Sequence, residues 1–142
     1  MGATQQFCTF FLDGLFFGVE VEKVQEVIRH QKTTRVPLAA PEIGGLINLR
    51  GQIVTAVDLR RKLALADRGE AQVPMNVVVR SDDGAISMLV DEIGDVVEVE
   101  DTDFECPPDT LRGAARELIR GAFKLKGRLL LLLDTERAMK MA

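Results

Sequence analysis

The stretch from Ile43 to Leu59, IGGLINLRGQIVTAVDL, predicts a complete β-hairpin, because two runs of β-forming residues flank a turn signal. A two-residue loop with glycine first, Gly51-Gln52, suits a type II′ turn, which would pair Arg50 with Ile53. One face of this hairpin would then be wholly apolar, with Ile47, Leu49, Val54 and Ala56. The other face would mix Asn48, Arg50 and Thr55 with Leu46, Ile53 and Val57. A long cation among aliphatic side chains marks this second face as the candidate functional surface. The stem of Arg50 can lie along Ile53 while its guanidinium seeks an acceptor, and Glu26 is the acceptor that we expect.

The same pattern returns near the C-terminus, from Ile119 to Asp134, as IRGAFKLKGRLLLLLD. The offset is 76 positions and places Gly51 at the position equivalent to Gly127. We therefore expect Leu49 and Val54, and their equivalents Leu125 and Leu130, to be buried. A weaker match, with an offset of 69 positions, aligns 17–27 (FGVEVEKVQEV) with 86–96 (ISMLVDEIGDV). Two related halves joined by loops of different length account for both offsets. The five leucines from Leu129 to Leu133 leave no polar alternate position, so both faces of that strand should be covered, most simply by the other half of a shared core.

The remaining chain is mostly short predicted strands with tight turns. The expected strands are 7–12, 15–21, 76–80, 85–90 and 93–99, with Asp13-Gly14 as a hairpin turn. Residues 22–29 could form a short helix, or a single helical turn that leads into a strand from Gln25. Thr33 to Pro37 should be extended, and Pro41 fits the first turn of a short helical segment. Asp58 should cap a helix that runs through Leu65, with the side chains of 60–62 exposed. Asp134 should cap a last helix that runs to Met141.

Length and composition limit the possible function classes. The chain has 142 residues, 46% hydrophobic and 28% charged, which suits one globular unit. Its longest apolar run is far shorter than the roughly 20 residues of a membrane-spanning helix. The N-terminus lacks the features of a signal peptide, so we expect a cytoplasmic protein. Cys8 and Cys106 form no C-x-x-C motif, and free buried thiols are expected.

Nothing in the sequence supplies a catalytic or metal-binding constellation. The single histidine, His30, has no obvious partner, and acid pairs such as Asp82-Asp83 fall in turns. A net charge of −4 and the lack of Trp and Tyr disfavour a nucleic-acid-binding barrel. Charge is nevertheless uneven, with eleven acids and no Lys or Arg from 81 to 111 and eight basic residues from 29 to 68. We expect a binding module that docks in a defined orientation between partners of different charge.

The residues of the central hairpin, GLINLRGQIV followed by VDL, resemble the signature of the CheW family of chemotaxis coupling proteins. Other segments resemble the family in the same order: 17–19 (FGV), 23–27 (KVQEV), 34–37 (TRVP), 89–96 (LVDEIGDV), Pro107-Pro108, 119–121 (IRG) and 129–134 (LLLLLD). The resemblance spans about 7–139. Phe17 replaces the usual Tyr, and Thr55-Ala56 lacks the usual Pro.

This resemblance implies an all-β fold with short helices, in which two SH3-like five-stranded barrels pack on a shared hydrophobic core. One CheW-like domain would cover 7–139, with pseudo-repeat subdomains at about 7–66 and 75–139, a linker at about 66–74, and terminal segments that can exchange between them. By position, the residues at the receptor groove or supporting it would be Val24, Glu26, Asn48, Arg50 and Val96.

The resemblance also implies a function. The protein would be a non-enzymatic scaffold, without cofactor or metal, that couples a CheA-type histidine kinase to the cytoplasmic tip of methyl-accepting chemotaxis receptors. It would be cytoplasmic and recruited to membrane receptor arrays, and the barrel edges would dock the CheW-like regulatory domain of the kinase. The alternative within the family is a coupling protein for a non-flagellar output such as pili or gliding. A nucleic-acid-binding barrel is the alternative outside it.

Overall fold

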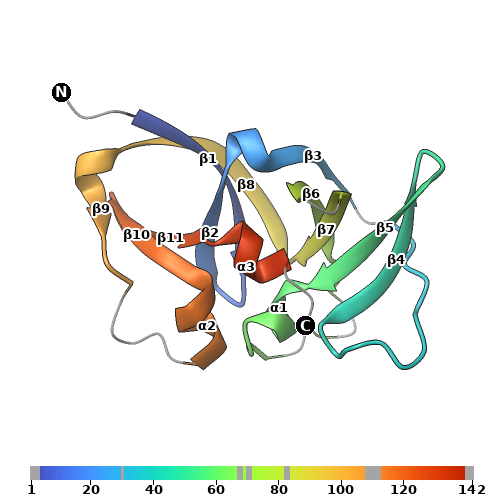
Figure 1. Ribbon diagram of the computed structural model, residues 1–142. Coiled ribbons are helices and arrows are strands. Elements are labelled where there is room, and N and C mark those ends of the chain that lie inside the picture. The colour runs from blue at the N-terminus through green and yellow to red at the C-terminus, as the bar shows by residue number, and fades with distance from the viewer. Residues whose placement is uncertain are drawn as a thin grey trace.

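The computed structural model describes residues 4–29, 31–66, 69, 72–81, 84–107 and 113–139. Within these residues, eleven strands and a few short helices follow one another (Figure 1). The strands are β1 (Thr4–Leu12), β2 (Leu15–Glu20), β3 (Val24–Ile28), β4 (Ile43–Leu49), β5 (Gln52–Asp58), β6 (Met75–Ser81), β7 (Gly84–Val90), β8 (Glu92–Glu100), β9 (Phe104–Glu105), β10 (Ile119–Leu125) and β11 (Arg128–Leu133). The helices are η1 (Val21–Lys23), α1 (Leu59–Lys62), η2 (Asp101–Asp103), α2 (Gly113–Leu118) and α3 (Thr135–Met139).

The strands form two sheets, seen as the left and right halves of Figure 1. Sheet A has the order β8-β1-β2-β11-β10-β9, and sheet B has the order β3-β6-β7-β5-β4. Each sheet curls around a small apolar core of its own, so we call the two units barrel A and barrel B. Barrel B is continuous along the chain from β3 to β7, whereas barrel A is assembled from the segments on either side of it. The first hairpin, β1–β2, therefore belongs with the strands of the second sequence half.

The internal repeat is preserved in how the strands pair. Thr55 of β5 lies opposite Ile86 of β7 in a parallel pair, and Leu131 of β11 lies opposite Phe17 of β2 in another. Adding 76 to Thr55 gives Leu131, and subtracting 69 from Ile86 gives Phe17, so the first pair maps onto the second. Both sequence offsets therefore describe one structural repeat. The predicted repeat of the two hairpins is thus confirmed at the level of individual partners.

The central hairpin forms, but its turn lies one residue earlier than predicted. Leu49 pairs with Gln52, which makes Arg50-Gly51 the turn. Both of these residues have positive φ, 51° and 88°, as a type I′ turn requires. The predicted type II′ turn at Gly51-Gln52, with Arg50 paired to Ile53, is therefore wrong. The predicted apolar face is correct, because Ile47, Leu49, Val54 and Ala56 are all buried.

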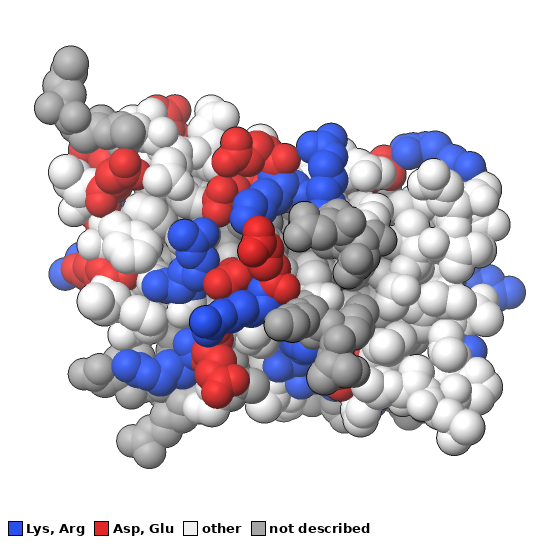
Figure 2. All heavy atoms as spheres, viewed as in Figure 1, with Lys and Arg blue, Asp and Glu red and all other residues white. Residues whose placement is uncertain are grey.

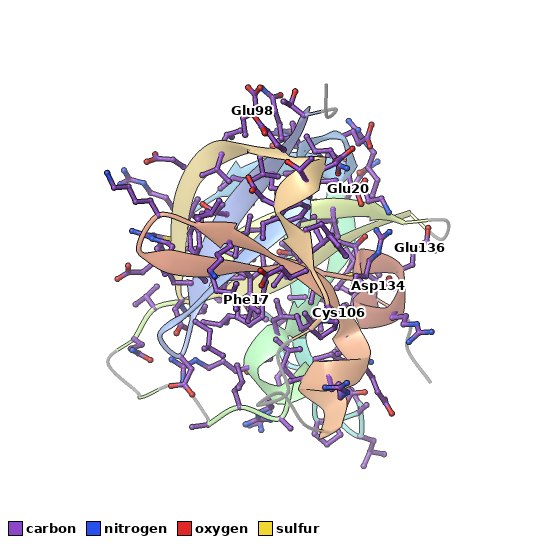
Figure 3. The ribbon with its side chains drawn as sticks, turned by 90° about the vertical axis from the view of Figure 1, so that its left-hand side faces the viewer. Phe17, Glu20, Glu98, Cys106, Asp134 and Glu136 are labelled. Atoms are coloured by element: carbon purple, nitrogen blue, oxygen red, sulfur yellow. The ribbon has the colours of Figure 1, made fainter. Side chains whose placement is uncertain are left out.

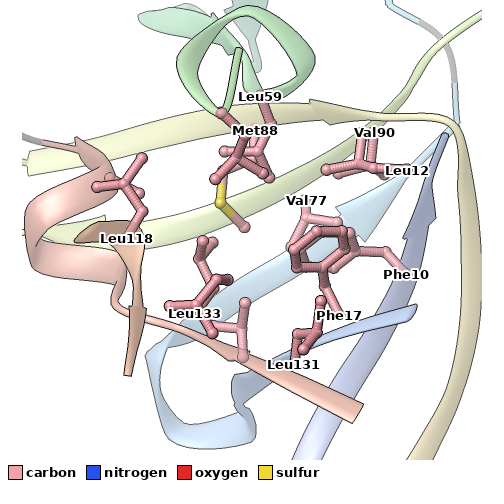
Figure 4. Close-up of a cluster of buried hydrophobic side chains, with 14 of the residues drawn as sticks. Phe10, Leu12, Phe17, Leu59, Val77, Met88, Val90, Leu118, Leu131 and Leu133 are labelled. Carbon is pink, nitrogen blue, oxygen red and sulfur yellow. The ribbon is translucent and has the colours of Figure 1, made fainter. Parts of the chain in front are cut away.

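Three apolar clusters hold the fold together. The largest lies between the barrels and takes residues from both sheets, among them Phe10, Phe17, Val77, Met88 and Leu131 (Figure 4). Each barrel also has an inner cluster, around Phe123 and Leu130 in barrel A and around Ile47 and Val54 in barrel B. These two pairs of residues are equivalent under the 76-residue offset.

The leucine run contributes to two of the clusters at once. Leu131 and Leu133 face the shared cluster, while Leu130 and Leu132 face the interior of barrel A. All four are at most 4% exposed, so the prediction that both faces are covered is confirmed.

Several local predictions are settled by the structure. Residues 22–29 take the second alternative, a single 3-10 turn that leads into β3. Pro41 lies in a turn and not in a helical segment. Asp58 and Asp134 do cap α1 and α3, since their Oδ1 atoms accept the backbone N–H of Arg60 and Arg137. The first helix ends at Lys62, however, and not at Leu65 as predicted, and the predicted end of the last helix, Met141, lies outside the described residues. Leu125, expected to be as buried as Leu49, is only half-buried. Both cysteines are free as expected, but Cys106 is exposed and Cys8 is only half-buried.

The prediction that 60–62 are exposed is wrong for Arg60, which is 5% exposed and is held by Asp91. His30 and Asp82-Asp83 lie outside the described residues.

Candidate partner-binding site

The five candidate residues lie on three different strands and one turn. Val24 and Glu26 are on β3, Asn48 is on β4, Arg50 is in the β4–β5 turn and Val96 is on β8. Arg50 and Glu26 are in direct contact, and Asn48 contacts the same turn. Val96 lies on the end strand of the other barrel.

Arg50 and Glu26 form a two-pronged ion pair at the surface. Nη1 of Arg50 donates to Oε1 of Glu26 at 2.9 Å, and Nη2 donates to Oε2 at 2.6 Å. This geometry matches the planar guanidinium to the planar carboxylate. The Arg50 side chain is 74% exposed, while that of Glu26 is only 18% exposed. Glu26 was the acceptor expected for Arg50, and that contact is confirmed.

The pair joins the two ends of sheet B. β3 and β4 are the first and last strands in the order β3-β6-β7-β5-β4, so they face each other across the open side of the barrel. Arg50, at the tip of the β4–β5 hairpin, reaches across this opening to Glu26 on β3. The ion pair thus fixes the position of the hairpin tip relative to β3.

The hydrogen bond from Arg50 to Glu26 raises the pKa of the guanidinium above its usual value, with a smaller contribution from the charge of Glu26. Arg50 is therefore cationic at every physiological pH. Because the pair is solvent-exposed, its contribution to folding is small, and its value lies in orienting two charged groups at the surface.

Arg50 adopts a backbone conformation that is unfavourable for a residue with a side chain. Its φ of 51° falls in the left-handed region, where Gly, Asn and Asp are common and where other residues carry a cost of about 1–2 kcal/mol. Oδ1 of Asn48 accepts the backbone N–H of Gly51 at 2.9 Å and holds this turn in place. Strain of this kind often marks positions whose side chain serves a function.

Exposed apolar side chains accompany the charged pair. Val27 on β3 is 39% exposed, Ile53 on β5 is 65% exposed and Val96 on β8 is 57% exposed. Val27 and Val96 are related by the 69-residue offset and lie on the end strands of the two sheets. Val24, in contrast, is half-buried and packs against the shared core, so it supports the surface from beneath.

Val27 and Ile53 were missed as candidates in the sequence. The signal for Ile53 was present, since it falls on the mixed face of the hairpin opposite Asn48. For Val27 the signal was hidden, because the position could equally belong to the inner face of a short helix. In the structure it alternates with half-buried neighbours along β3 and points outward.

The face seen in Figure 2 divides into two parts. The area over β4 and β5, on the right, consists mainly of uncharged residues, whereas acidic and basic residues are interleaved over the centre and left. Leu38, which is fully exposed, precedes β4, and the backbone of Thr34 pairs with Leu46 at the outer edge of this strand. The end of sheet B at β4 is thus a largely uncharged surface beside a strand edge.

The described residues offer the chemistry of a binding surface. Among them, no group of three or more His, Cys, Asp or Glu side chains is placed to hold a metal ion. No helix in the described part of the chain is long and apolar enough to span a membrane. Ion pairs, exposed aliphatic side chains and strand edges are the usual elements of protein–protein recognition.

Comparison with known proteins agrees with this reading. The family model described as "CheW-like domain" matches residues 6–142. The chain is 28% identical to Chemotaxis protein CheW of Bacillus subtilis over 135 residues, which cover 95% of this chain and 86% of that protein. It is 29% identical to Chemotaxis protein CheW of Klebsiella aerogenes, over 95% of this chain and 81% of that protein.

The fold is also that of a solved structure. The crystal structure of the scaffolding protein TtCheW from Thermoanaerobacter tengcongensis superposes with a TM-score of 0.86 at 22% sequence identity. The match covers 98% of this chain and 94% of the other. The all-β architecture of two packed SH3-like barrels is therefore shared. Because the family model spans nearly the whole chain, this protein belongs to the CheW-like domain family.

Proposed function

We propose that this protein is a non-enzymatic adaptor that couples a CheA-type histidine kinase to the cytoplasmic tips of methyl-accepting chemotaxis receptors. Membership of the CheW-like domain family along nearly the whole chain carries this proposal, together with relatives named as chemotaxis proteins. In the cell the protein would be cytoplasmic and recruited to receptor arrays at the membrane.

The receptor surface in this proposal is built around the Arg50–Glu26 pair. Arg50 presents a cation in a fixed position, and the exposed Val27 and Ile53 supply apolar area on the same barrel, to which Val96 would add an exposed side chain on the end strand of the other barrel. Such a mixture suits a helical receptor tip with an apolar stripe and flanking acids, which would be recognised by shape and charge together. Val24 and Asn48 would act as supports, the first from the core and the second by holding the turn.

The kinase surface in this proposal lies at the strand edges. The Thr34–Leu46 bridge already occupies the middle of the outer edge of β4, so the uncharged surface beside this edge, with the exposed Leu38, is the part suited to contact with a related barrel domain. This surface is distinct from the Arg50–Glu26 pair, so the two partners could bind at the same time.

Two binding measurements on one set of variants test the proposal. Arg50→Ala should weaken binding of a purified receptor cytoplasmic fragment and lower receptor-dependent kinase activation, while binding of the kinase regulatory domain is retained. Arg50→Glu should be worse, because it places a second carboxylate beside Glu26. Lys124→Ala, which removes an exposed cation from barrel A, is the matched control and should change neither affinity.

The outcome against the proposal is equally specific. Normal receptor binding by Arg50→Ala, or an equal loss of affinity for both partners, would exclude Arg50 as the organiser of the receptor surface. Failure of the wild-type chain to bind either partner would exclude the adaptor function itself. Folding is not at issue, since loss of an exposed pair should change the free energy of unfolding by no more than about 1 kcal/mol.

A further inference from the structure

A groove of about 420 Å³ opens on barrel A between the end strand β8 and the tip of the β10–β11 hairpin. Its floor is apolar, with Phe11, Phe16, Val97 and Leu125. Its rim carries charged side chains. Figure 3 looks toward barrel A, where the β10–β11 hairpin projects on the left and the acidic Glu98 lies at the top.

This groove occupies the place in barrel A that the Arg50–Glu26 pair occupies in barrel B. The sequence offsets place Lys126 level with Arg50 and Asp95 level with Glu26, and both Lys126 and Asp95 line the groove. In the part of the chain that the structure describes, Lys126 forms no ion pair, so nothing equivalent closes barrel A. A lysine cannot make the two-pronged contact of an arginine, and an aspartate is one methylene shorter than a glutamate. The opening that is bridged in one barrel is therefore left open in the other.

Arg128 is the central group of the groove. Its guanidinium lies over the ring of Phe16, 4.7 Å from the ring centroid, and 5.9 Å from the centroid of Phe11. The two rings are themselves in contact, with centroids 5.0 Å apart. Stacking of this kind holds the guanidinium in place while its N–H groups remain available at the edges. Within the described residues no acceptor takes these donors.

The charges around the groove favour an acidic ligand. Lys124, Lys126 and Arg128 follow one another on alternate residues of the hairpin, and all three are exposed. The facing strand β8 carries four acids, Glu92, Asp95, Glu98 and Glu100, but among the described residues only Asp95 of these lines the groove. The cations that line it, Lys126 and Arg128, outnumber this single acid, although the whole chain has a net charge of −4.

The neighbouring strand adds backbone groups that a peptide can use. β8 is the terminal strand of sheet A, so along its outer edge no other strand of that sheet pairs with it. An extended segment can hydrogen-bond to such an edge and direct alternate side chains to one side. The groove therefore combines an apolar floor, a preoriented cation and an open strand edge.

We propose that this groove binds an extended acidic segment of a partner protein. A carboxylate of the segment pairs with Arg128 and Lys126, and an adjacent aliphatic or aromatic side chain packs on Phe11, Phe16 and Leu125. The site is separate from the Arg50 surface and does not depend on the adaptor function proposed above.

The test is fluorescence anisotropy of labelled synthetic peptides titrated with the full-length chain. The first peptide alternates Glu or Asp with Leu or Phe over eight residues. A second replaces the acids by Gln and Asn, and a third replaces the apolar residues by Gly. Only the first should bind well, and its affinity should fall as salt is raised, because exposed charges are screened.

Variants of the hairpin distinguish a built site from general charge attraction. Arg128→Ala should weaken binding of the first peptide by about 10-fold or more, because a charge-assisted two-pronged contact is lost. Arg128→Lys should restore only part of the affinity, because lysine keeps the charge but not the stacked plane. Lys126→Ala should weaken binding to a smaller degree. Lys124→Ala, on the same hairpin but outside the groove, should remain within about 2-fold of the wild type.

Three results would overturn the proposal. The first is equal loss of affinity in the Arg128→Ala and Lys124→Ala variants, which would indicate unspecific charge attraction. The second is equal binding of all three peptides. The third is self-association of the chain in sedimentation runs that Arg128→Ala abolishes, which would make a second copy the occupant. Urea unfolding of each variant, with an unchanged midpoint expected, separates these outcomes from misfolding.

Discussion

The buried arginine of α1 is the most informative residue to change. Nε and Nη2 of Arg60 donate to the two carboxylate oxygens of Asp91, at 2.8 and 2.5 Å, and Nη1 donates to the backbone carbonyl of Ala66 at 3.0 Å. Asp91 lies at the junction of β7 and β8, where the chain passes from barrel B to barrel A. Its carboxylate also accepts the backbone N–H of Asp13, in the β1–β2 turn. One ion pair thus ties together a helix, the connection between the barrels and a turn of barrel A.

The size of the effect follows from burial. The side chains of Arg60 and Asp91 are 6% and 13% exposed, so neither can return to water when its partner is removed. Breaking a buried pair from one side costs about 3–5 kcal/mol. We expect Arg60→Met to lower the free energy of unfolding by about 3 kcal/mol, the lower end of this range, because Asp91 still accepts the hydrogen bond from the Asp13 N–H and keeps some contact with solvent. That is a fall in melting temperature of about 6–12 °C for a chain of this size.

A double-mutant cycle in urea measures the interaction directly. Asp91→Asn keeps an acceptor for the Asp13 N–H but removes the charge, and the double variant should lose about 2 kcal/mol less than the sum of the single variants. The hydrogen bond from Asp91 raises the pKa of Arg60, so the arginine is charged across any practical pH range. A coupling energy below about 0.5 kcal/mol, or single variants within about 1 kcal/mol of the wild type, would refute the assignment.

Three further predictions follow from the geometry. Arg50→Gly should keep the free energy of unfolding or raise it by up to about 1 kcal/mol, since glycine accepts a φ of 51° without strain, yet it should abolish receptor-dependent kinase activation. Urea unfolding and a receptor-binding assay measure the two properties separately, and a clear loss of stability would contradict this account. Leu131→Asp should be destabilising by several kcal/mol, because it places a charge in the cluster between the barrels, and an unchanged melting temperature would exclude a shared core. A thiol reagent at pH 8 should modify the exposed Cys106 rapidly and Cys8 slowly, because burial raises the pKa of the Cys8 thiol. Cys106→Ser should leave only the slow phase of modification, and a remaining fast phase would contradict the assignment of that phase to Cys106.

Much of the fold could be predicted from local sequence patterns. Alternation of apolar residues identified the buried face of the central hairpin, because strand side chains alternate whatever the details of the turn. The position of that turn could not be settled in the same way. A single glycine fits the first place of one turn type and the second place of another, and the choice depends on whether Arg50 accepts a positive φ.

Arg60 shows a different limit. Its neighbours in the sequence are basic, and a short helix beginning at an N-cap gives no sign of which side faces the core. The partner that buries it, Asp91, is 31 residues away and becomes its neighbour only when β5 and β7 pair within barrel B. The Arg50–Glu26 contact was easier to predict, since the mixed face of a hairpin and an acidic strand were both visible in the sequence.

The insertion of barrel B into barrel A has a consequence for how the protein is made. Strands β3 to β7 leave the ribosome as one continuous segment and can close barrel B while the rest of the chain is still being synthesised. The β1–β2 hairpin emerges first but cannot be completed, because its parallel partner β11 is near the C-terminus. At about 5–20 residues per second, the roughly 100 intervening residues take on the order of 5 to 20 seconds. Throughout that interval Phe7 has no finished barrel interior to enter, and Phe10 and Phe17 have no completed cluster between the barrels, so the nascent β1–β2 segment is where we expect chaperones to bind.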